Sequence, residues 1–465
     1  GTIIIEGDDD GGVGIHAIGG NTGNITHTGT IQVVSETRAD DTDSDGRIDG
    51  PIAVGSNRVA ILVDGAAVFT GDIVAASGST LTVIGNDSAG LRVLTGLDGN
   101  IDMAGNVRLI GTNGYGVEVR GDVTGDVEID GRIEINGEGS GGVLIASDVD
   151  GGVSIGATIN ATAFRFIGRP GEAIRDELEP EDFADSASPV MINGNVAGGV
   201  FFSGFSADRP STPSANIGVR GSAPAAHILA NASSGDIVLG EVVLEAIPDD
   251  PDTADVDESV AAELIGYALV NRGALNAFGN LDGIDTVAIQ VNGEDGHTVT
   301  LTGGFLNEAE IGGSAWAATS TGVLIGSGAI VPTFANTGDI LIRTNLEGSV
   351  ARGVYLDTGA NVPTLINSGV IDATSLNGGG AVALTDVSNS LTLIENTGEI
   401  AAYHLNTVVG TDPQVDDLVA IDLSANTVGT TVRQCRADGA ADDFVEELIG
   451  EVRFGSGDDQ LVIES

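Results

Sequence analysis

Apolar and polar residues alternate in short runs along most of the chain. The apolar members of three successive runs are Leu91, Val93, Ile101, Met103, Val107 and Leu109. Alternation with a period of two predicts β-strands that turn one face toward a core and the other toward solvent. Glycines separate the runs, and glycine permits the backbone conformations that tight corners need.

The runs recur with a fixed period. The segments GLRV, GVEV and GVLI begin at Gly90, Gly116 and Gly142, which are 26 residues apart, and Gly99 and Gly125 follow nine residues after the first two. Self-similarity at a fixed period indicates a solenoid. The sequence therefore predicts an all-β fold, a right-handed parallel β-helix with three strands per coil. We expect corners at offsets 0, 9 and 15 of the repeat, with equivalent strands paired about 4.8 Å apart.

Toward the C-terminus the coil lengthens. GVLI at Gly322 recurs as GVYL at Gly353, 31 residues later. An Asn-Thr-Gly or Asn-Ser-Gly tripeptide begins at Asn336, Asn367 and Asn396, each time before an apolar run, and predicts a repeated corner. With 26 to 31 residues per coil, we expect about fifteen coils and a rod about 70 Å long.

Outward-facing residues give a test of the predicted register. Two predicted pairs in adjacent coils have opposite charges, Arg92 with Glu118 and Arg108 with Glu134. A third pair, Asp102 with Glu128, has like charges. Exposed opposite-charge pairs contribute only about 0.2–1 kcal/mol each, so they indicate register more than stability.

The repeat is interrupted in five places. The predicted loop insertions are residues 36–57, 165–188, 204–222, 246–263 and 405–418. We expect them to leave a single elongated β-helix that spans residues 1–465. Residues 170–184 (PGEAIRDELEPEDFA) are expected to form a short helix. Insertions in solenoids often carry recognition.

The composition favours many short strands over several globular domains. The chain of 465 residues has 71 glycines and only 4% aromatic residues, whereas large globular cores use aromatic side chains heavily. The formal net charge of −50 argues against nucleic acid as a partner and favours divalent cations. Cys435 is the only cysteine, so no internal disulfide forms. The sequence contains no apolar run of about 18 residues, so it predicts no transmembrane helix.

The segment DTDSDGRIDG matches much of a calcium-binding loop. The predicted calcium ligands are Asp41, Asp43, Asp45, Asp49 and the backbone carbonyl of Arg47. A hard cation needs several oxygen ligands, and this spacing brings them together around the turn at Gly46. The acidic residue usual at position 12 is missing, because that residue is Ile52. A solvated acidic loop is the alternative.

Two further acidic segments are weaker candidates for calcium. The first contains Asp249, Asp250, Asp252, Asp255 and Asp257 but lacks a turn glycine. The second, GSGDDQL at residues 455–461, is half of a calcium-binding nonapeptide repeat, and such a site needs tandem copies. We expect a solvated loop and a β-turn, respectively.

An enzyme that cleaves surface polysaccharides, a lyase or a hydrolase, is the alternative function, because parallel β-helices carry such activities. It would need clustered carboxylates, a base and aromatic rings that stack on sugars. The histidines are scattered over the repeat, at His16, His27, His227, His297 and His404, and Trp316 is the only tryptophan. Nucleophile-elbow and metalloprotease motifs are absent. We therefore expect a protein that is not an enzyme.

Several segments of the C-terminal half carry a resemblance to a known group. They are VNRGAL (270–275), VPTFANTGDI (331–340), VPTLINSGVIDAT (362–374), LTLIENTGEI (391–400), AIDLSANTVGTTVRQ (420–434) and FGSGDDQLVI (454–463). On these segments the chain resembles the passenger region of alphaproteobacterial, sphingomonad-like autotransporters, the proteins of type V secretion. The resemblance covers residues 260–465, and the earlier half only through the repeat. It implies a β-helical passenger exported through a C-terminal outer-membrane barrel.

The resemblance thus implies an extracellular location at the bacterial cell surface. The chain departs from the full pattern in having no visible signal peptide and no barrel, from which we expect cleavage or trimming after residue 463. We expect a structural or adhesive surface protein that binds other copies of itself, cell-surface glycans or other cells. Solenoid ends expose strand edges, and no capping segment is evident at Gly1 or Ser465, so we expect assembly into a layer or filament. Calcium would brace the loops and screen the acidic charge.

Overall fold

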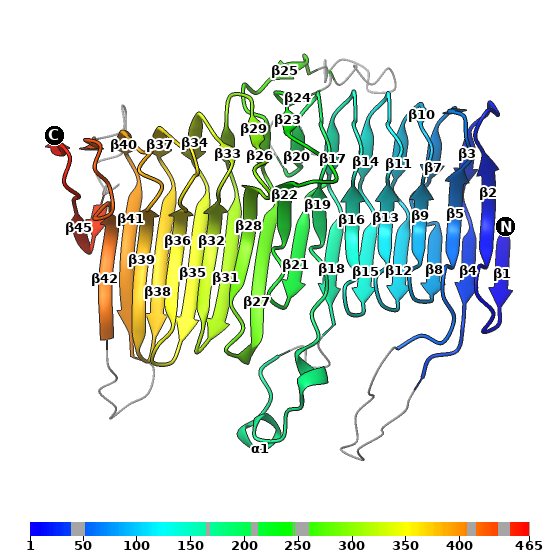
Figure 1. Cartoon of the computed structure of the whole chain (residues 1–465), viewed down its shortest axis with the longest axis horizontal. Helices are drawn as coiled ribbons and strands as arrows, with labels where there is room; N and C mark the ends of the chain where they lie inside the picture. Colours follow the sequence, from blue (N-terminus) through cyan, green and yellow to red (C-terminus); the bar gives the residue numbers. More distant parts are fainter. Residues whose placement is uncertain are drawn as a thin grey trace, which may run out of the picture.

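The computed structural model is an elongated stack of coils with the two termini at opposite ends (Figure 1). It describes residues 1–38, 52–163, 168–205, 213–244, 246, 260–406, 415–435 and 447–464. Most strands belong to three long parallel sheets, each of 13 strands, and successive strands of the chain pass from one sheet to the next. This arrangement is a three-faced parallel β-helix, so the predicted fold class is confirmed.

The three sheets are named here after their first strands. The β1 sheet contains β1 (Thr2–Glu6), β4 (Thr30–Val34), β8 (Thr80–Ile84), β12 (Asn106–Ile110), β15 (Arg132–Asn136), β18 (Thr158–Thr162), β21 (Asn216–Arg220), β27 (Ala274–Asp282), β31 (Glu310–Trp316), β35 (Asp339–Asn345), β38 (Val370–Leu376), β41 (Glu399–Leu405) and β44 (Glu447–Ile449). The β2 sheet contains β2 (Val13–Ile18), β5 (Val59–Asp64), β9 (Ala89–Val93), β13 (Tyr115–Val119), β16 (Gly141–Ile145), β19 (Val190–Ile192), β22 (Ala226–Ala230), β28 (Thr286–Gly293), β32 (Thr319–Ile325), β36 (Val350–Leu356), β39 (Gly379–Asp386), β42 (Val415–Asp422) and β45 (Glu451–Arg453).

The third sheet has the shortest strands of the three in most coils. The β3 sheet contains β3 (Ile25–His27), β7 (Ile73–Ala75), β11 (Ile101–Met103), β14 (Val127–Ile129), β17 (Val153–Ile155), β20 (Val200–Phe202), β26 (Leu269–Asn271), β30 (Phe305–Asn307), β34 (Thr333–Asn336), β37 (Thr364–Asn367), β40 (Leu393–Asn396), β43 (Thr431–Gln434) and β46 (Gln460–Ile463). Short ladders at the corners are β6 (Phe69–Thr70) with β10 (Leu97–Asp98), and β23 (Ile237–Leu239) with β29 (Val299–Leu301) and β33 (Ala329–Ile330).

The predicted register is confirmed in the first half of the rod. The observed pairs include Glu118 with Arg92, Arg108 with Glu134, and Asp102 with Glu128. The alternating apolar residues named from the sequence all point inward and are at most 2% exposed. They belong to one apolar core that extends through the stacked coils. A period of two within strands and a fixed coil length are therefore sufficient to specify this part of the fold.

The glycines at offset 0 of the repeat are not at corners, and this prediction was wrong. Gly90, Gly116 and Gly142 lie inside β9, β13 and β16. A Cβ atom on Gly90 would lie 2.6 Å from the Val107 side chain, and one on Gly116 would lie 2.6 Å from that of Ile133. These glycines allow strands of the β2 sheet to pack closely against side chains of the β1 sheet. The corner glycines are those at offsets 9 and 15.

In the C-terminal half, asparagine side chains at equivalent positions of successive coils are buried and form a hydrogen-bonded ladder. The asparagine ladder consists of Asn271, Asn307, Asn336, Asn367 and Asn396, all 0% exposed. Each side-chain amide donates to the amide oxygen of the next asparagine at 2.7 Å, and the last donates to the Gln434 amide oxygen at 2.8 Å. The sequence predicted the corners, but not that their side chains join successive coils.

Thirteen coils rather than about fifteen are present in the described chain, because insertions take up residues that a regular repeat would use. The insertion after β18 contains helix α1 (Glu172–Arg175) and a 3-10 turn (Pro180–Phe183), which confirms the predicted helix. The segment predicted as an insertion over 204–222 includes strand β21 of the β1 sheet. No helix in the described ranges is long and apolar enough to cross a membrane.

One insertion covers an apolar strip on the outside of the rod. Strands β24 (Val243–Leu244) and β25 (Glu263–Leu264) form an antiparallel pair beside the β3 sheet. A second apolar cluster beneath this insertion consists of Phe201, Val242, Leu244, Val270, Leu306 and Ala335. Four of these residues are outward positions of successive strands in the β3 sheet, so the insertion is held to the rod by apolar burial.

Candidate functional site

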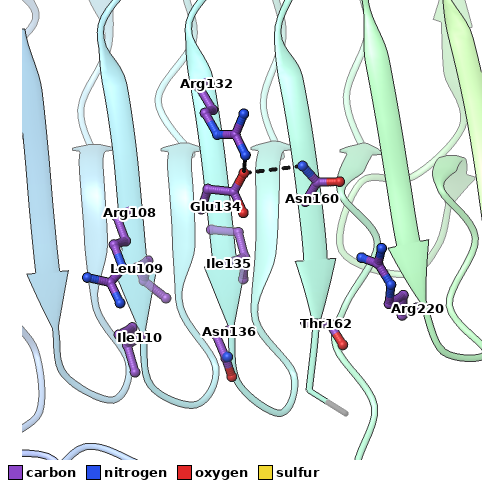
Figure 2. Close-up of a pocket in the computed structure, with 10 residues that line it drawn as sticks. All are labelled: Arg108, Leu109, Ile110, Arg132, Glu134, Ile135, Asn136, Asn160, Thr162 and Arg220. Atoms are coloured by element: carbon purple, nitrogen blue, oxygen red, sulfur yellow. Dashed lines mark hydrogen bonds and ion pairs between the residues drawn. The ribbon is translucent and has the colours of Figure 1, made fainter. Parts of the chain in front are cut away.

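A groove on the outside of the β1 sheet is the best candidate for a ligand site. It has a volume of about 420 Å³, within the range of pockets that take small molecules. It crosses four neighbouring strands, β12, β15, β18 and β21 (Figure 2). We call it the arginine groove. Its lining residues are Arg108, Leu109, Ile110, Arg132, Glu134, Ile135, Asn136, Asn160, Thr162 and Arg220.

The charge of the arginine groove is opposite to that of the chain. Three of its residues are arginines and one, Glu134, is acidic, whereas the whole chain has 68 acidic and 18 basic residues. The basic residues are all arginine in this sequence. Arginine presents a planar fork of donors that matches a carboxylate better than the point charge of lysine does. Amide and hydroxyl groups of Asn136, Asn160 and Thr162 lie between the arginines.

The Glu134 carboxylate binds Arg132 of its own strand and Asn160 of the next coil. It does not bind Arg108, which the register places beside it. Its Oε1 atom accepts from Arg132 Nη2 at 2.5 Å and from Asn160 Nδ2 at 3.2 Å. Arg132 precedes Glu134 by two residues and therefore points to the same side of the sheet. The predicted proximity of Arg108 and Glu134 is thus confirmed, but the ion pair expected between them is absent from the described residues (Figure 2).

The second predicted pair, Arg92 with Glu118, forms and is buried rather than exposed. The Glu118 side chain is 6% exposed and accepts from Arg92 Nε at 2.5 Å and Arg120 Nε at 2.6 Å. Leu144 lies beside Glu118 in the next coil and is itself 4% exposed. Removing one partner from a buried ion pair costs more than removing one from an exposed pair. This cluster is structural, because its charges are satisfied internally.

The insertion after β18 begins at the edge of the arginine groove and is fixed to the rod at two points. Arg169 Nε and Nη2 donate to the two carboxylate oxygens of Asp282 at 2.6 Å each, and this guanidinium lies 4.4 Å from the centre of the Trp316 ring. The pairing with Arg169 lowers the pKa of Asp282. At the other point, the Asp185 carboxylate accepts from the Ser222 amide at 2.8 Å.

A row of carboxylates on the β3 sheet is a second place where titratable groups gather. Asp102 and Glu128 are neighbours in adjacent coils, and Asp130 lies near Glu128. Partial desolvation, followed by repulsion from Asp130, raises the pKa of Glu128 to about 7. Desolvation also raises the pKa values of Asp102 and Asp130. We call these three residues the carboxylate row.

The predicted calcium ligands lie outside the described residues. This applies to Asp41, Asp43, Asp45, Arg47 and Asp49, and to the acidic segment 249–257. The base of the first loop is described: Arg38 N donates to Ile52 O at 2.9 Å and Val54 N donates to Glu36 O at 3.0 Å. Elsewhere in the described chain, no group of three or more His, Cys, Asp and Glu side chains is arranged to hold a metal ion. Calcium binding stays a prediction.

The residues considered for glycan cleavage are not brought together in the arginine groove. Its lining includes a single carboxylate, no histidine and no aromatic ring. The carboxylate row belongs to a different sheet, and Trp316 is occupied by Arg169. The groove can therefore hold an anion and exchange hydrogen bonds with hydroxyl groups, but it lacks the pair of carboxylates that glycoside hydrolysis uses.

The sequence contained one usable signal for the arginine groove. Arginines at positions 108 and 132 are outward residues in adjacent coils of the 26-residue repeat. Arg220 reaches the groove only across the insertion after β18, where the repeat is interrupted. Comparison with known proteins finds no matching family model, no matching curated protein and no matching solved structure.

Proposed function

We propose that this protein is a non-catalytic, extracellular rod of the bacterial cell surface with a structural and adhesive role. The observation that carries the proposal is the continuous solenoid, in which three sheets of 13 strands enclose one apolar core. Coils joined by backbone hydrogen bonds about every 4.8 Å form a stiff body that holds outward side chains in fixed rows. Export as an autotransporter passenger, which the resemblance implies, is the proposed route to the surface.

The adhesive surface in this proposal is the arginine groove. It gathers basic side chains on a chain whose net charge is −50, so it is a local attractive site on a surface that otherwise repels anions. Self-association into a layer or filament is part of the same proposal. Acidic rods approach one another only when their charge is screened or bridged, and calcium can do both.

Two measurements test the structural role. Immunogold electron microscopy of intact cells should place the protein on the outer surface, in an ordered layer or in filaments. Light scattering of the purified chain should show assemblies in millimolar calcium that dissociate with a chelator. Gold confined to the cell interior would overturn the proposed location, and a monomer at every calcium concentration would overturn the proposed assembly.

A glycan-cleaving enzyme is the competing function, and one observation favours it. A carboxyl group with a pKa near 7, as in Glu128, has the property required of a general acid. The test is an assay for new reducing ends, or for unsaturated sugar products, on acidic and neutral bacterial polysaccharides. Turnover by the wild-type chain that Glu128→Gln abolishes would replace the proposed function with this one.

A further inference from the structure

One guanidinium of the arginine groove has no partner among the residues that the structure describes. Arg108 is paired in register with Glu134, yet the Glu134 carboxylate is held by Arg132 and Asn160. Among the described residues, none forms an ion pair or a side-chain hydrogen bond with Arg108. Several other arginines of the described chain hold a carboxylate, as Arg272 does with Glu308. In a chain with a large excess of acidic residues, a guanidinium left without a partner is available for an anionic ligand.

The groups of the groove are laid out along the rod axis. Arg108 is on β12 and Arg220 on β21, three strand spacings away, or about 14 Å. Between them lie Asn160 and Thr162 of β18 and Asn136 of β15. The outward side chain of Ile110 contributes an apolar part to the floor. A ligand that reaches from Arg108 across β15 and β18 must therefore be extended, with its acidic groups beside neutral, hydroxyl-bearing units.

We infer that the arginine groove binds a carboxylate-bearing oligosaccharide, a short run of uronic acid residues lying along the rod axis with one carboxylate on Arg108. Arginine forms two parallel hydrogen bonds with a carboxylate, and these charge-assisted bonds are the stronger kind. The amides of Asn136 and Asn160 donate and accept, which suits sugar hydroxyls. This inference rests on the adhesive role proposed for the groove and names its ligand.

The charge of the whole chain discriminates between kinds of anion. A nucleic acid or polyphosphate has closely spaced charges, which interact with the acidic rod over many coils and are repelled. The groove also lacks an aromatic ring on which a base could stack. A uronic acid oligomer has one carboxylate per sugar. A short oligomer of this kind spans only the coils of the groove, so most of the acidic rod lies beyond the screening distance of about 8 Å at physiological salt.

The binding test uses isothermal titration calorimetry on the full chain at 50 mM salt, without calcium. The probes are a galacturonic acid trisaccharide, the uncharged galactose trisaccharide and inorganic phosphate. We expect the uronate probe to bind, its affinity to fall as salt is raised to 300 mM, and the two other probes to give no heat of binding at the same concentrations.

Three variants assign the binding to the groove. Arg108→Gln should weaken binding about tenfold, since it removes one charge-assisted pair, and Arg108→Lys should restore part of the affinity. Glu134→Gln should tighten binding several-fold, because it removes a negative charge beside the ligand and releases Arg132. Arg343→Gln is the matched control, because Arg343 occupies the same outward row of the β1 sheet as Arg220, outside the groove.

The inference is overturned by any of three results. These are no uronate binding up to 10 mM, equal binding of the neutral trisaccharide or of phosphate, or an equal loss of affinity in the Arg343→Gln and Arg108→Gln variants. Thermal melting of each variant verifies that it folds. The surface role fails on different evidence, the microscopy of intact cells, so the two failures are distinguishable.

Discussion

Replacing Asn336 by alanine tests whether the asparagine ladder holds the coils together. The Asn336 amide donates to Asn367 Oδ1 at 2.7 Å and to the carbonyls of Gly338 at 3.1 Å and Val370 at 3.2 Å. Its own oxygen accepts from Asn307 Nδ2 at 2.7 Å. The side chain is fully buried, so water does not reach these groups in the folded state.

The magnitude follows from the groups that alanine would leave behind. Asn367 Oδ1 loses its described donor, and one N–H of Asn307 loses its acceptor, although Asn307 Nδ2 keeps its bond to Ala309 O at 2.9 Å. Each buried polar group left without a partner costs about 1–3 kcal/mol. We expect Asn336→Ala to lower the free energy of unfolding by about 2–5 kcal/mol. Asn336→Asp should be worse, because it buries a charge against the Asn367 oxygen.

Urea denaturation followed by circular dichroism measures this free energy, and hydrogen-exchange mass spectrometry locates the change. Stability in a solenoid is a sum over coils and their interfaces, so faster exchange should be concentrated in β34 and β37 and their neighbours. Asn106→Ala is the matched control, because Asn106 is an exposed strand asparagine. Exposed substitutions of this kind usually change stability by about 0.5 kcal/mol or less.

The stabilising role of the ladder is refuted if Asn336→Ala is no more destabilising than Asn106→Ala, or if exchange in β34 and β37 is unchanged. Either result would mean that the ladder hydrogen bonds merely replace bonds to water and add no net stability. A loss of stability in Asn336→Asp smaller than that in Asn336→Ala would refute the proposed donor direction.

Three further predictions concern the acidic groups. Because the folded-state pKa of Glu128 is about 7 and lies above its unfolded value of 4.5, its proton stabilises the fold at low pH and this contribution is lost as pH rises toward 7. Glu128→Gln should therefore raise the melting temperature at pH 8 by about 1–2 °C and not at pH 4, whereas Asp150→Asn, an exposed control, should show no such pH dependence. Asp282→Ala should free the Arg169 end of the insertion after β18 while the Asp185 contact remains. A red shift of the emission of Trp316, the only tryptophan, would report this loss, and unchanged emission would contradict the anchoring. Asp43→Ala should abolish calcium binding in calorimetry, and undiminished binding would exclude that loop.

The repeating part of this protein follows from local sequence patterns. Val107 and Leu109 point inward, and Arg92 lies beside Glu118, because a period of two and a coil of 26 residues apply the same local rule in every turn. Once one coil is known, the backbone pairing of the next follows, and the fold class follows from the pairing.

The tertiary structure alone decided which side chains find a partner. The repeat brings Arg108 and Glu134 side by side, but Glu134 binds Arg132, since partner choice depends on competing side chains that the register does not rank. The contact of Arg169 with Asp282 joins residues 113 positions apart through an insertion that obeys no period. Local periodicity thus specified the rod, while competition among side chains in three dimensions left Arg108, at the arginine groove, without a partner among the described residues.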